Sequence, residues 1–337
     1  MNHFLRRATP FLLMLVAFVV ALTSAGFWFA HKPIELRAPV VDFTVQRGLG
    51  MRQAANHIAA SGVAVQPRLL TWLAQISGRA NRIKAGSYEV HTGVTPWQLI
   101  LKLSDGDVSQ GAVLLVEGWT FRQVRQALET TPDLVADTAG LSDADILGRI
   151  GASETHPEGL FFPDTYLFDK HSGALAVLRR AYGSMQKRLA AAWAERDPAS
   201  PLKSPYEALI LASIVEKETG RPDDRGLVAS VFSNRLRIGM PLQTDPSVIY
   251  GLGADFDGKL RRKDLDTDHP WNTYTRPGLP PTPIAMPGPD ALRAAVRPQQ
   301  SDYLYFVARG DGSSQFSRSL DEHNRAVERF IRNGRAN

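Results

Sequence analysis

The 337-residue chain contains no cysteine, which excludes disulfide bonds, thiol nucleophiles and cysteine-bound zinc. Its eight histidines include no His-x-x-x-His pair, and the sequence has neither a Gly-x-Ser-x-Gly elbow nor a phosphate-binding glycine loop with lysine. We therefore expect no metal and no cofactor. Long runs of one charge are also missing, since 39 basic and 34 acidic residues leave a net charge of +5 spread along the chain. This distribution does not favour nucleic-acid binding.

The composition is that of a folded protein. Hydrophobic residues make up 44% of the chain and charged residues 22%, a balance that can build a real core. A length of 337 residues exceeds one typical domain. We expect two folded units and an anchor.

An uncharged, almost wholly apolar run lies between Arg7 and His31. At about 1.5 Å per residue it is long enough to cross a hydrocarbon core of roughly 30 Å. Arg6 and Arg7 precede the run, so the positive charge favours a cytoplasmic N-terminus. The alternative is a cleaved signal peptide, but the run is longer than a usual signal core. We expect residues 1–31 to form a cytoplasmic tip and an uncleaved transmembrane helix, with the rest of the chain outside the cytoplasm.

A short linker, residues 32–40, leads into a small module over residues 41–108. Alternating and helical periodicities predict two strands with two helices between them, at residues 42–45, 51–60, 67–76 and 88–90. This β-α-α-β order resembles a LysM module, and the resemblance implies that the module binds N-acetylglucosamine in a glycan. The alternative is a compact spacer that holds the next domain away from the membrane.

The remainder, residues 109–337, has the pattern of one larger α+β domain. Helices are predicted at residues 173–196, 206–217, 223–238 and 320–333, with strands at residues 113–116 and 303–308. Residues 264–288 are rich in proline and have few periodic apolar positions. Such a long irregular loop is typical of a functional surface.

One apolar helix of this domain is closed by carboxylates, at residues 209–219. Glu218 follows Val215 and Ile214 at helical spacing, which predicts that it lies on the apolar face, whereas Glu216 follows small residues. Loss of hydration would raise the pKa of Glu218 and keep a proton available for a leaving group. The structural alternative is an ion pair with a basic residue beyond the helix, such as Arg221 or Arg225.

Four turn-rich segments combine amide, hydroxyl, carboxyl and aromatic groups, at residues 161–166, 234–237, 242–246 and 272–274. Sugars need this mixture, because their hydroxyls require polar partners and their C–H faces lie on rings. Each residue alone has an ordinary structural explanation, such as a turn. As a set they predict a glycan site, whose candidate binding residues are Gln243, Asp245, Asn272, Tyr274, Asn234 and Arg235.

Ordered strings in this domain carry a more specific resemblance. They are VEG at 116–118, PEG at 157–159, FPDT at 162–165, ASIVEKET at 212–219, VFSNRLRIGM at 231–240, LQTDP at 242–246, VIYG at 248–251, NTY at 272–274, GLPP at 278–281 and YLYFV at 303–307. Together with the anchor and the LysM-like module, they resemble the YceG-like (MltG) endolytic murein transglycosylases. The resemblance covers nearly the whole chain and implies a YceG-like catalytic domain.

The resemblance implies cleavage within nascent peptidoglycan strands between N-acetylmuramic acid and N-acetylglucosamine. The product would carry a 1,6-anhydro-N-acetylmuramoyl end, and cleavage would end strand elongation. The family's essential glutamate corresponds to Glu218, which would act as general acid and then as base. The resemblance also implies a single-pass protein of the inner membrane, a periplasmic catalytic domain and partnership with cell-wall synthases such as bifunctional penicillin-binding proteins.

Two other functions remain open from the residues themselves. The first is a lysozyme-type hydrolase that uses Glu218 as the acid with Asp245 or Asp164 as the second carboxylate. The second is a non-catalytic glycan-binding scaffold at the membrane. Analysis of the product ends separates a lyase from a hydrolase, and substitution of Glu218 separates both from a scaffold.

Overall fold

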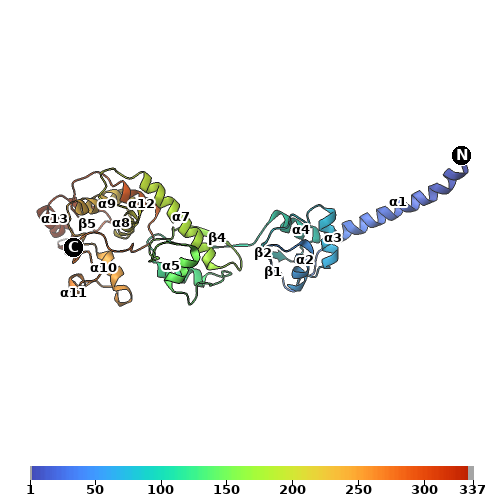
Figure 1. The fold of residues 1–337 in the computed structure, drawn as a ribbon, viewed down its shortest axis with the longest axis horizontal. Helices are drawn as coiled ribbons and strands as arrows, with labels where there is room; N and C mark the ends of the chain where they lie inside the picture. The colour runs from blue at the N-terminus through green and yellow to red at the C-terminus, as the bar shows by residue number, and fades with distance from the viewer. Residues whose placement is uncertain (1, 333–337) are drawn as a thin grey trace. The chain divides into compact units, whose positions relative to one another are not determined.

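A computed structural model describes residues 2–332 and confirms a mixed α+β protein (Figure 1). Met1 and residues 333–337, the ends of the predicted anchor and catalytic domain, lie outside the described residues. The structure divides into two compact units. The first unit contains the described residues up to Gly111 together with Leu167–Ser172, and the second contains Ala112–Tyr166 and the chain from Gly173 onward.

The N-terminal helix α1 runs over Asn2–His31. Its segment Leu13–His31 has a mean hydropathy of 2.2, and within the described chain no other helix is long and apolar enough to cross a membrane. This confirms the predicted apolar helix. A signal sequence would have the same property, so the uncleaved anchor stays a prediction. Arg6 and Arg7, on which the predicted orientation depends, lie outside the residues whose side chains are described.

The first unit has the predicted β-α-α-β order. Its elements are β1 (Val40–Val45), α2 (Met51–Ala60), α3 (Pro67–Ile76) and β2 (Gly86–His91), followed by α4 (Pro96–Asp105). The strands pair antiparallel, with Phe43 opposite Tyr88. Alternate β1 side chains are buried, and they pack with both helices around a single core. The LysM-like assignment and its glycan binding stay predictions.

The strand predicted at residues 113–116 had no partner that could be recognised from the sequence. The structure places β3 at Gln110–Leu114, in a two-stranded sheet with β4 (Thr165–Asp169). The strand therefore begins earlier and ends earlier than its apolar run suggested. Pairing with a distant strand, rather than local periodicity, sets its limits.

The second unit is built around α8 (Pro205–Glu218). This helix packs against α7 (Ala174–Ala194), α9 (Pro222–Arg237) and α12 (Pro289–Val296). Its residues from Ala208 to Val215 are all buried. The sequence prediction of a single apolar face on this helix is therefore wrong, because neighbouring helices cover it on several sides.

Proline and a capping serine fix where α8 begins. The Ser204 hydroxyl accepts a hydrogen bond from the backbone N–H of Glu207, and Pro205 occupies the first turn, where a missing N–H costs little. Pro222 starts α9 in the same way. The helix ends at Glu218, and Thr219 takes an extended backbone conformation. Glu218 thus lies at a defined helix end, next to a turn into α9.

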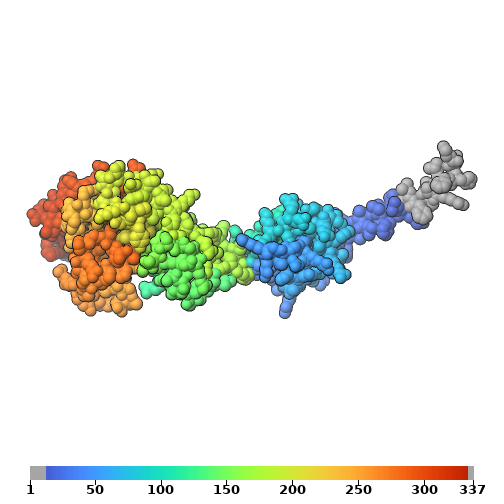
Figure 2. Space-filling model, viewed as in Figure 1, coloured from blue at the N-terminus to red at the C-terminus, as the bar shows by residue number. Residues whose placement is uncertain are grey.

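The other elements of this unit are shorter. They are α5 (Phe121–Thr130), α6 (Asp143–Ile150), α10 (Asp245–Leu252), a 3-10 turn (Gly253–Asp255), α11 (Arg262–Asp266), the antiparallel hairpin β5 (Tyr305–Ala308) and β6 (Ser314–Ser317), α13 (Leu320–Val327) and a π-helical turn (Glu328–Arg332). The predicted irregular loop is largely confirmed, although α11 occupies its first residues. In the space-filling view, the green surface around α5 adjoins the orange surface around α10 and α11 (Figure 2).

Candidate active site

Glu218 is half-buried at the C-terminal end of α8. Its carboxylate accepts a hydrogen bond from the hydroxyl of Thr244. Burial raises the pKa of Glu218 to about 7, and the charge of Asp245 acts in the same direction, whereas the Thr244 hydrogen bond and the charge of Arg235 lower it. At neutral pH this group can therefore give a proton and also accept one.

Two loops meet beside Glu218 and fix Thr244. The backbone N–H of Thr244 donates to the hydroxyl of Thr273 at 3.0 Å, and the backbone N–H of Gln243 donates to the carbonyl of Thr273 at 3.1 Å. The hydroxyls of Ser247 and Thr273 are 2.9 Å apart. Thr244 is only 1% exposed. Its hydroxyl therefore has little freedom to leave the carboxylate.

Asp245 and Tyr274, two of the predicted binding residues, form a pair at this site. The Tyr274 hydroxyl donates to Asp245 Oδ1 at 2.6 Å. Asp245 is exposed, and its charge raises the pKa of both Tyr274 and Glu218. Gln243, which is also exposed, precedes them with a left-handed φ of 50°. These three side chains lie where a substrate could reach them.

Arg235 is a buried cation that connects two main-chain segments next to Glu218. Its Nε donates to the carbonyl of Leu304 at 2.7 Å, and its Nη1 donates to the carbonyl of Leu242 at 2.8 Å. Burial lowers the pKa of Arg235, while the charge of Glu218 opposes that change. Arg235 thus contributes a fixed positive charge near Glu218 and holds the irregular segment before Gln243. Its contact with sugar stays a prediction.

The amides of Asn234 and Asn272 are already engaged with the main chain. Asn234 Nδ2 donates to the carbonyls of Ser301 and Tyr303, both at 2.9 Å. Asn272 is 0% exposed, and its Nδ2 donates to the carbonyl of Thr267 at 2.7 Å. These hydrogen bonds hold the neighbouring loops in shape. They do not favour the predicted direct contact of either amide with a sugar, which stays a prediction.

The neighbouring carboxylate, Glu216, shows why helical spacing was not decisive. It is also half-buried, and burial raises its pKa as well. Its Oε2, however, accepts a hydrogen bond from the backbone N–H of Gly288 at 2.9 Å. The described charged neighbours of Glu218 are Asp245 and Arg235, not the Arg221 or Arg225 of the structural alternative. Glu218 is distinguished from Glu216 by its contact with the polar loop that carries Thr244, rather than by the helix face on which it lies.

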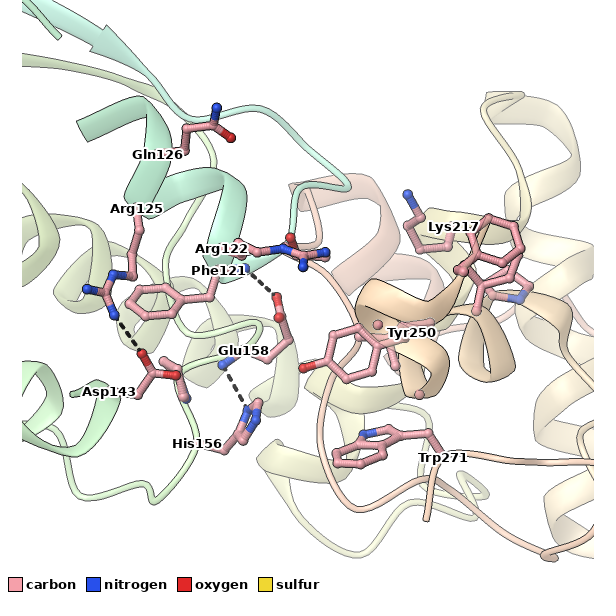
Figure 3. A pocket seen from close by; sticks show the side chains of 18 of the residues that line it. Phe121, Arg122, Arg125, Gln126, Asp143, His156, Glu158, Lys217, Tyr250 and Trp271 are labelled. Atoms are coloured by element: carbon pink, nitrogen blue, oxygen red, sulfur yellow. Dashed lines mark hydrogen bonds and ion pairs between the residues drawn. The ribbon is translucent and has the colours of Figure 1, made fainter. Parts of the chain in front are cut away.

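A pocket of about 860 Å³ lies in the same unit (Figure 3). Lys217 and Pro246 line it, so it adjoins the segments that carry Glu218 and Asp245, although Glu218 itself is not part of the lining. The pocket also contains the buried carboxyl of Glu158, which accepts a hydrogen bond from the backbone N–H of Phe121 at 2.9 Å. Burial raises the pKa of Glu158 to about 7.

Sequence reasoning missed two residues of this arrangement. Thr244 lies within the LQTDP string and Glu158 within the PEG string, but neither was predicted to have a role. Neither position is indicated by a local periodicity of the sequence. Their membership in the LQTDP and PEG strings was the one signal that could have indicated them. Within residues 2–332, no three His, Asp or Glu side chains gather as a metal ion would require. The expected lack of a cofactor remains a prediction.

Comparisons with known proteins agree on one family. A sequence model of the YceG-like family matches residues 43–329. An endolytic murein transglycosylase of Bacillus subtilis is 30% identical over 318 residues, covering 89% of this chain and 88% of that protein. An endolytic murein transglycosylase of Streptococcus pneumoniae is 27% identical over 94% of this chain and 65% of its own length. The crystal structure of a putative YceG-like protein from Listeria monocytogenes, 28% identical, superposes with a TM-score of 0.52 and covers 85% of this chain and 98% of that one.

Proposed function

The chain belongs to the YceG-like family, and from that membership we propose that it is an endolytic murein transglycosylase. It cuts nascent peptidoglycan strands between N-acetylmuramic acid and N-acetylglucosamine and leaves a 1,6-anhydro-N-acetylmuramoyl end. The names of its relatives from Bacillus subtilis and Streptococcus pneumoniae support this reaction. The observation that carries the assignment is the half-buried carboxyl of Glu218, with a pKa of about 7, among the polar loops.

The reaction needs one group that acts first as an acid and then as a base. Protonated Glu218 gives its proton to the glycosidic oxygen, and the bond from that oxygen to the anomeric carbon of the muramoyl residue breaks. The 6-hydroxyl of the same residue bonds to the anomeric carbon and returns its proton to Glu218. No water is consumed, and the intramolecular nucleophile has a large proximity advantage. A pKa of about 7 suits both proton transfers.

Neighbouring groups supply orientation and charge. The Thr244 hydroxyl, held by its own buried contacts, keeps the carboxylate of Glu218 in one direction. The Arg235 guanidinium stabilises the carboxylate after it has lost its proton. Gln243, Asp245 and Tyr274 are the predicted residues that can contact sugar hydroxyls and N-acetyl groups from the exposed side of the loops.

The hydrolase alternative requires a second carboxylate beside Glu218. Asp245 is a charged neighbour of Glu218 and satisfies the requirement. Asp164 is exposed, and its carboxylate accepts a hydrogen bond from the backbone N–H of Thr165 at 2.8 Å. Mass spectrometry of the products released from purified peptidoglycan separates the two reactions. We expect muramoyl ends lighter by one water than hydrolysed ends; reducing muramoyl ends would assign a hydrolase.

The cellular setting is part of the proposal. We place α1 across the inner membrane, the catalytic domain in the periplasm, and the cut on strands that a cell-wall synthase is extending, so that cleavage ends elongation. The apolar segment Leu13–His31 supports the anchor, and the positive residues before it support the orientation. Bifunctional penicillin-binding proteins are the proposed partners.

A further inference from the structure

The pocket beside the Glu218 segment has an aromatic wall that is held rigidly. The rings of Tyr250 and Trp271 meet edge to face, with their centroids 5.6 Å apart and an interplanar angle of 64°. Trp271 Nε1 donates to the hydroxyl of Thr282 at 2.9 Å, and the Tyr250 hydroxyl is hydrogen-bonded to Glu158. Figure 3 shows both rings on the same side of the pocket as Glu158. Fixed rings of this kind are suited to the C–H face of a sugar.

Cationic groups also line this pocket. Arg122 and Arg125 reach the pocket from α5, and Lys217 reaches it from α8. Arg125 is already paired, because its Nη1 is 3.1 Å from Asp143 Oδ1. Lys217 Nζ donates to the carbonyl of Gly118 at 3.3 Å. Arg122 is exposed, and no hydrogen bond or ion pair joins it to any described residue.

A ring wall and an unpaired guanidinium fit a ligand with both a sugar face and an anion. A guanidinium binds a carboxylate through two parallel, charge-assisted hydrogen bonds, which are stronger than its hydrogen bonds to the neutral hydroxyls of an uncharged sugar. A pocket of about 860 Å³ is within the size range of small-ligand sites. Muramoyl residues carry the matching anion on a free lactyl group or, where a stem peptide is joined to that group by an amide bond, on the carboxylates of the peptide. Chitin, built from N-acetylglucosamine alone, has none.

We propose that this pocket is a substrate subsite for a carboxylate-bearing muramoyl unit, with the sugar against Tyr250 and Trp271 and the carboxylate on Arg122. The proposal rests on the proposed function, because the strand that is cut supplies this unit. Lys217 and Pro246 join the pocket to the segments of Glu218 and Asp245, so the subsite lies next to the cutting site along the strand. Arg122 then makes the enzyme prefer murein over uncharged glycans.

Binding to the full chain carrying Glu218→Gln tests the subsite without cleavage. The probes are a muramoyl tetrasaccharide with free lactyl groups, the same tetrasaccharide with stem peptides, and chitotetraose, each titrated by calorimetry. Arg122→Gln should weaken binding of carboxylate-bearing probes about tenfold and leave chitotetraose unchanged, because a charge-assisted hydrogen bond is lost. The matched control is Lys187→Gln, which removes a positive charge from an exposed position on α7 and should change no affinity.

The two muramoyl probes identify the source of the carboxylate. Weaker binding of only the peptide-free probe by the Arg122 variant assigns the lactyl carboxylate, and weaker binding of only the peptide-bearing probe assigns a carboxylate of the stem peptide. Weaker binding of both probes shows that Arg122 accepts either carboxylate, and each of these three results supports the subsite. Unchanged binding of both muramoyl probes, or an equal loss of affinity for chitotetraose, overturns it. These affinities do not depend on bond cleavage. A negative result for the subsite is therefore distinguishable from a negative result for the proposed reaction, because the reaction is tested separately by product analysis of the wild type.

Discussion

Glu158 and Glu218 are two carboxyls with similar acidity and different surroundings. Burial raises the pKa of each to about 7. Glu158 is 3% exposed and fixes Tyr250, whereas half-buried Glu218 meets Thr244 beside the exposed Asp245. Accessibility therefore supports the proposal that Glu218 carries out the proton transfers and that Glu158 positions Tyr250. A perturbed pKa alone would not have separated them.

Two substitutions at Glu218's neighbours should shift the pH profile in opposite directions. The Thr244 hydrogen bond lowers the pKa of Glu218, so Thr244→Val raises it and moves the alkaline limb of kcat/KM to higher pH. The charge of Asp245 raises that pKa, so Asp245→Asn moves the limb to lower pH. Rates of anhydro-end formation across pH measure both. Shifts in the same direction would contradict the electrostatic assignment of this site.

Stability should also respond to the acidity of Glu158. The folded-state pKa is raised from 4.5 to about 7, so the contribution to stability is fully present below about pH 4.5 and is lost as pH rises through 7. The loss reaches about 3 kcal/mol, at about 1.4 kcal/mol per pKa unit. Denaturant unfolding of wild type and Glu158→Gln at acidic and alkaline pH measures it. A difference between the two proteins that does not change with pH would show that Glu158 is not buried in this way.

The predicted site residues Glu218, Gln243, Asp245 and Tyr274 lie close together in the structure, but the reasons for selecting residues from the sequence were incomplete. Glu218 was selected by assuming one apolar face, yet α8 is buried from Ala208 to Val215 on every side. Asn272 was selected for its amide, yet the fold uses that amide for Thr267 and Leu265. Local spacing carries no information about which distant carbonyl will accept a hydrogen bond from a side chain. Such hydrogen bonds determine whether the side chain is free to contact a substrate.

At the scale of elements, the turn at Gly159 fixes Glu158 in the pocket. Gly159 has a left-handed φ of 79°, and a Cβ there would lie 2.5 Å from Cβ of Pro283. Gly140 has a similar φ of 73° but nothing within 4 Å of an added Cβ. Alanine at either position costs roughly 1 kcal/mol because its backbone must stay left-handed. Only Gly159→Ala also creates a steric clash, with Pro283.

The two glycine variants therefore form a matched pair. We expect Gly140→Ala to lose roughly 1 kcal/mol of unfolding free energy and Gly159→Ala roughly 1–3 kcal/mol more, because Pro283 cannot move freely. Urea unfolding of both variants gives the two losses. Equal losses of unfolding free energy in the two variants would mean that the turn at Gly159 accommodates the added Cβ without a clash with Pro283.

Elements with local signals were predictable, and those set by distant partners were not. The strands and helices of the β-α-α-β unit follow apolar periodicities within the chain, and the structure has them in that order. The limits of β3 depend on β4, which follows more than fifty residues later, and the sequence prediction missed both the partner and the register. The loop around Asn272 could be predicted as irregular, but its contact with Gln243 could not.

At the scale of the whole molecule, the missing cysteines make the orientation simple to test. A single Ala190→Cys substitution places one thiol at an exposed position of α7 in a chain that otherwise has none. If α1 has its N-terminus in the cytoplasm, a membrane-impermeant maleimide should label this thiol in intact spheroplasts. Labelling only after the membrane is broken would reverse the proposed orientation.

The central claim is that one carboxyl, at position 218, carries out the bond-breaking step. Glu216 provides a matched control on the same helix, because it is also half-buried with a raised pKa but is fastened to Gly288. Mass spectrometry should quantify the 1,6-anhydro-muramoyl ends that purified wild type, Glu218→Gln and Glu216→Gln release from peptidoglycan strands. We predict a loss of roughly 10²- to 10⁴-fold for Glu218→Gln with near wild-type release for Glu216→Gln; a folded Glu218→Gln protein that releases anhydro ends at the wild-type rate would contradict the account.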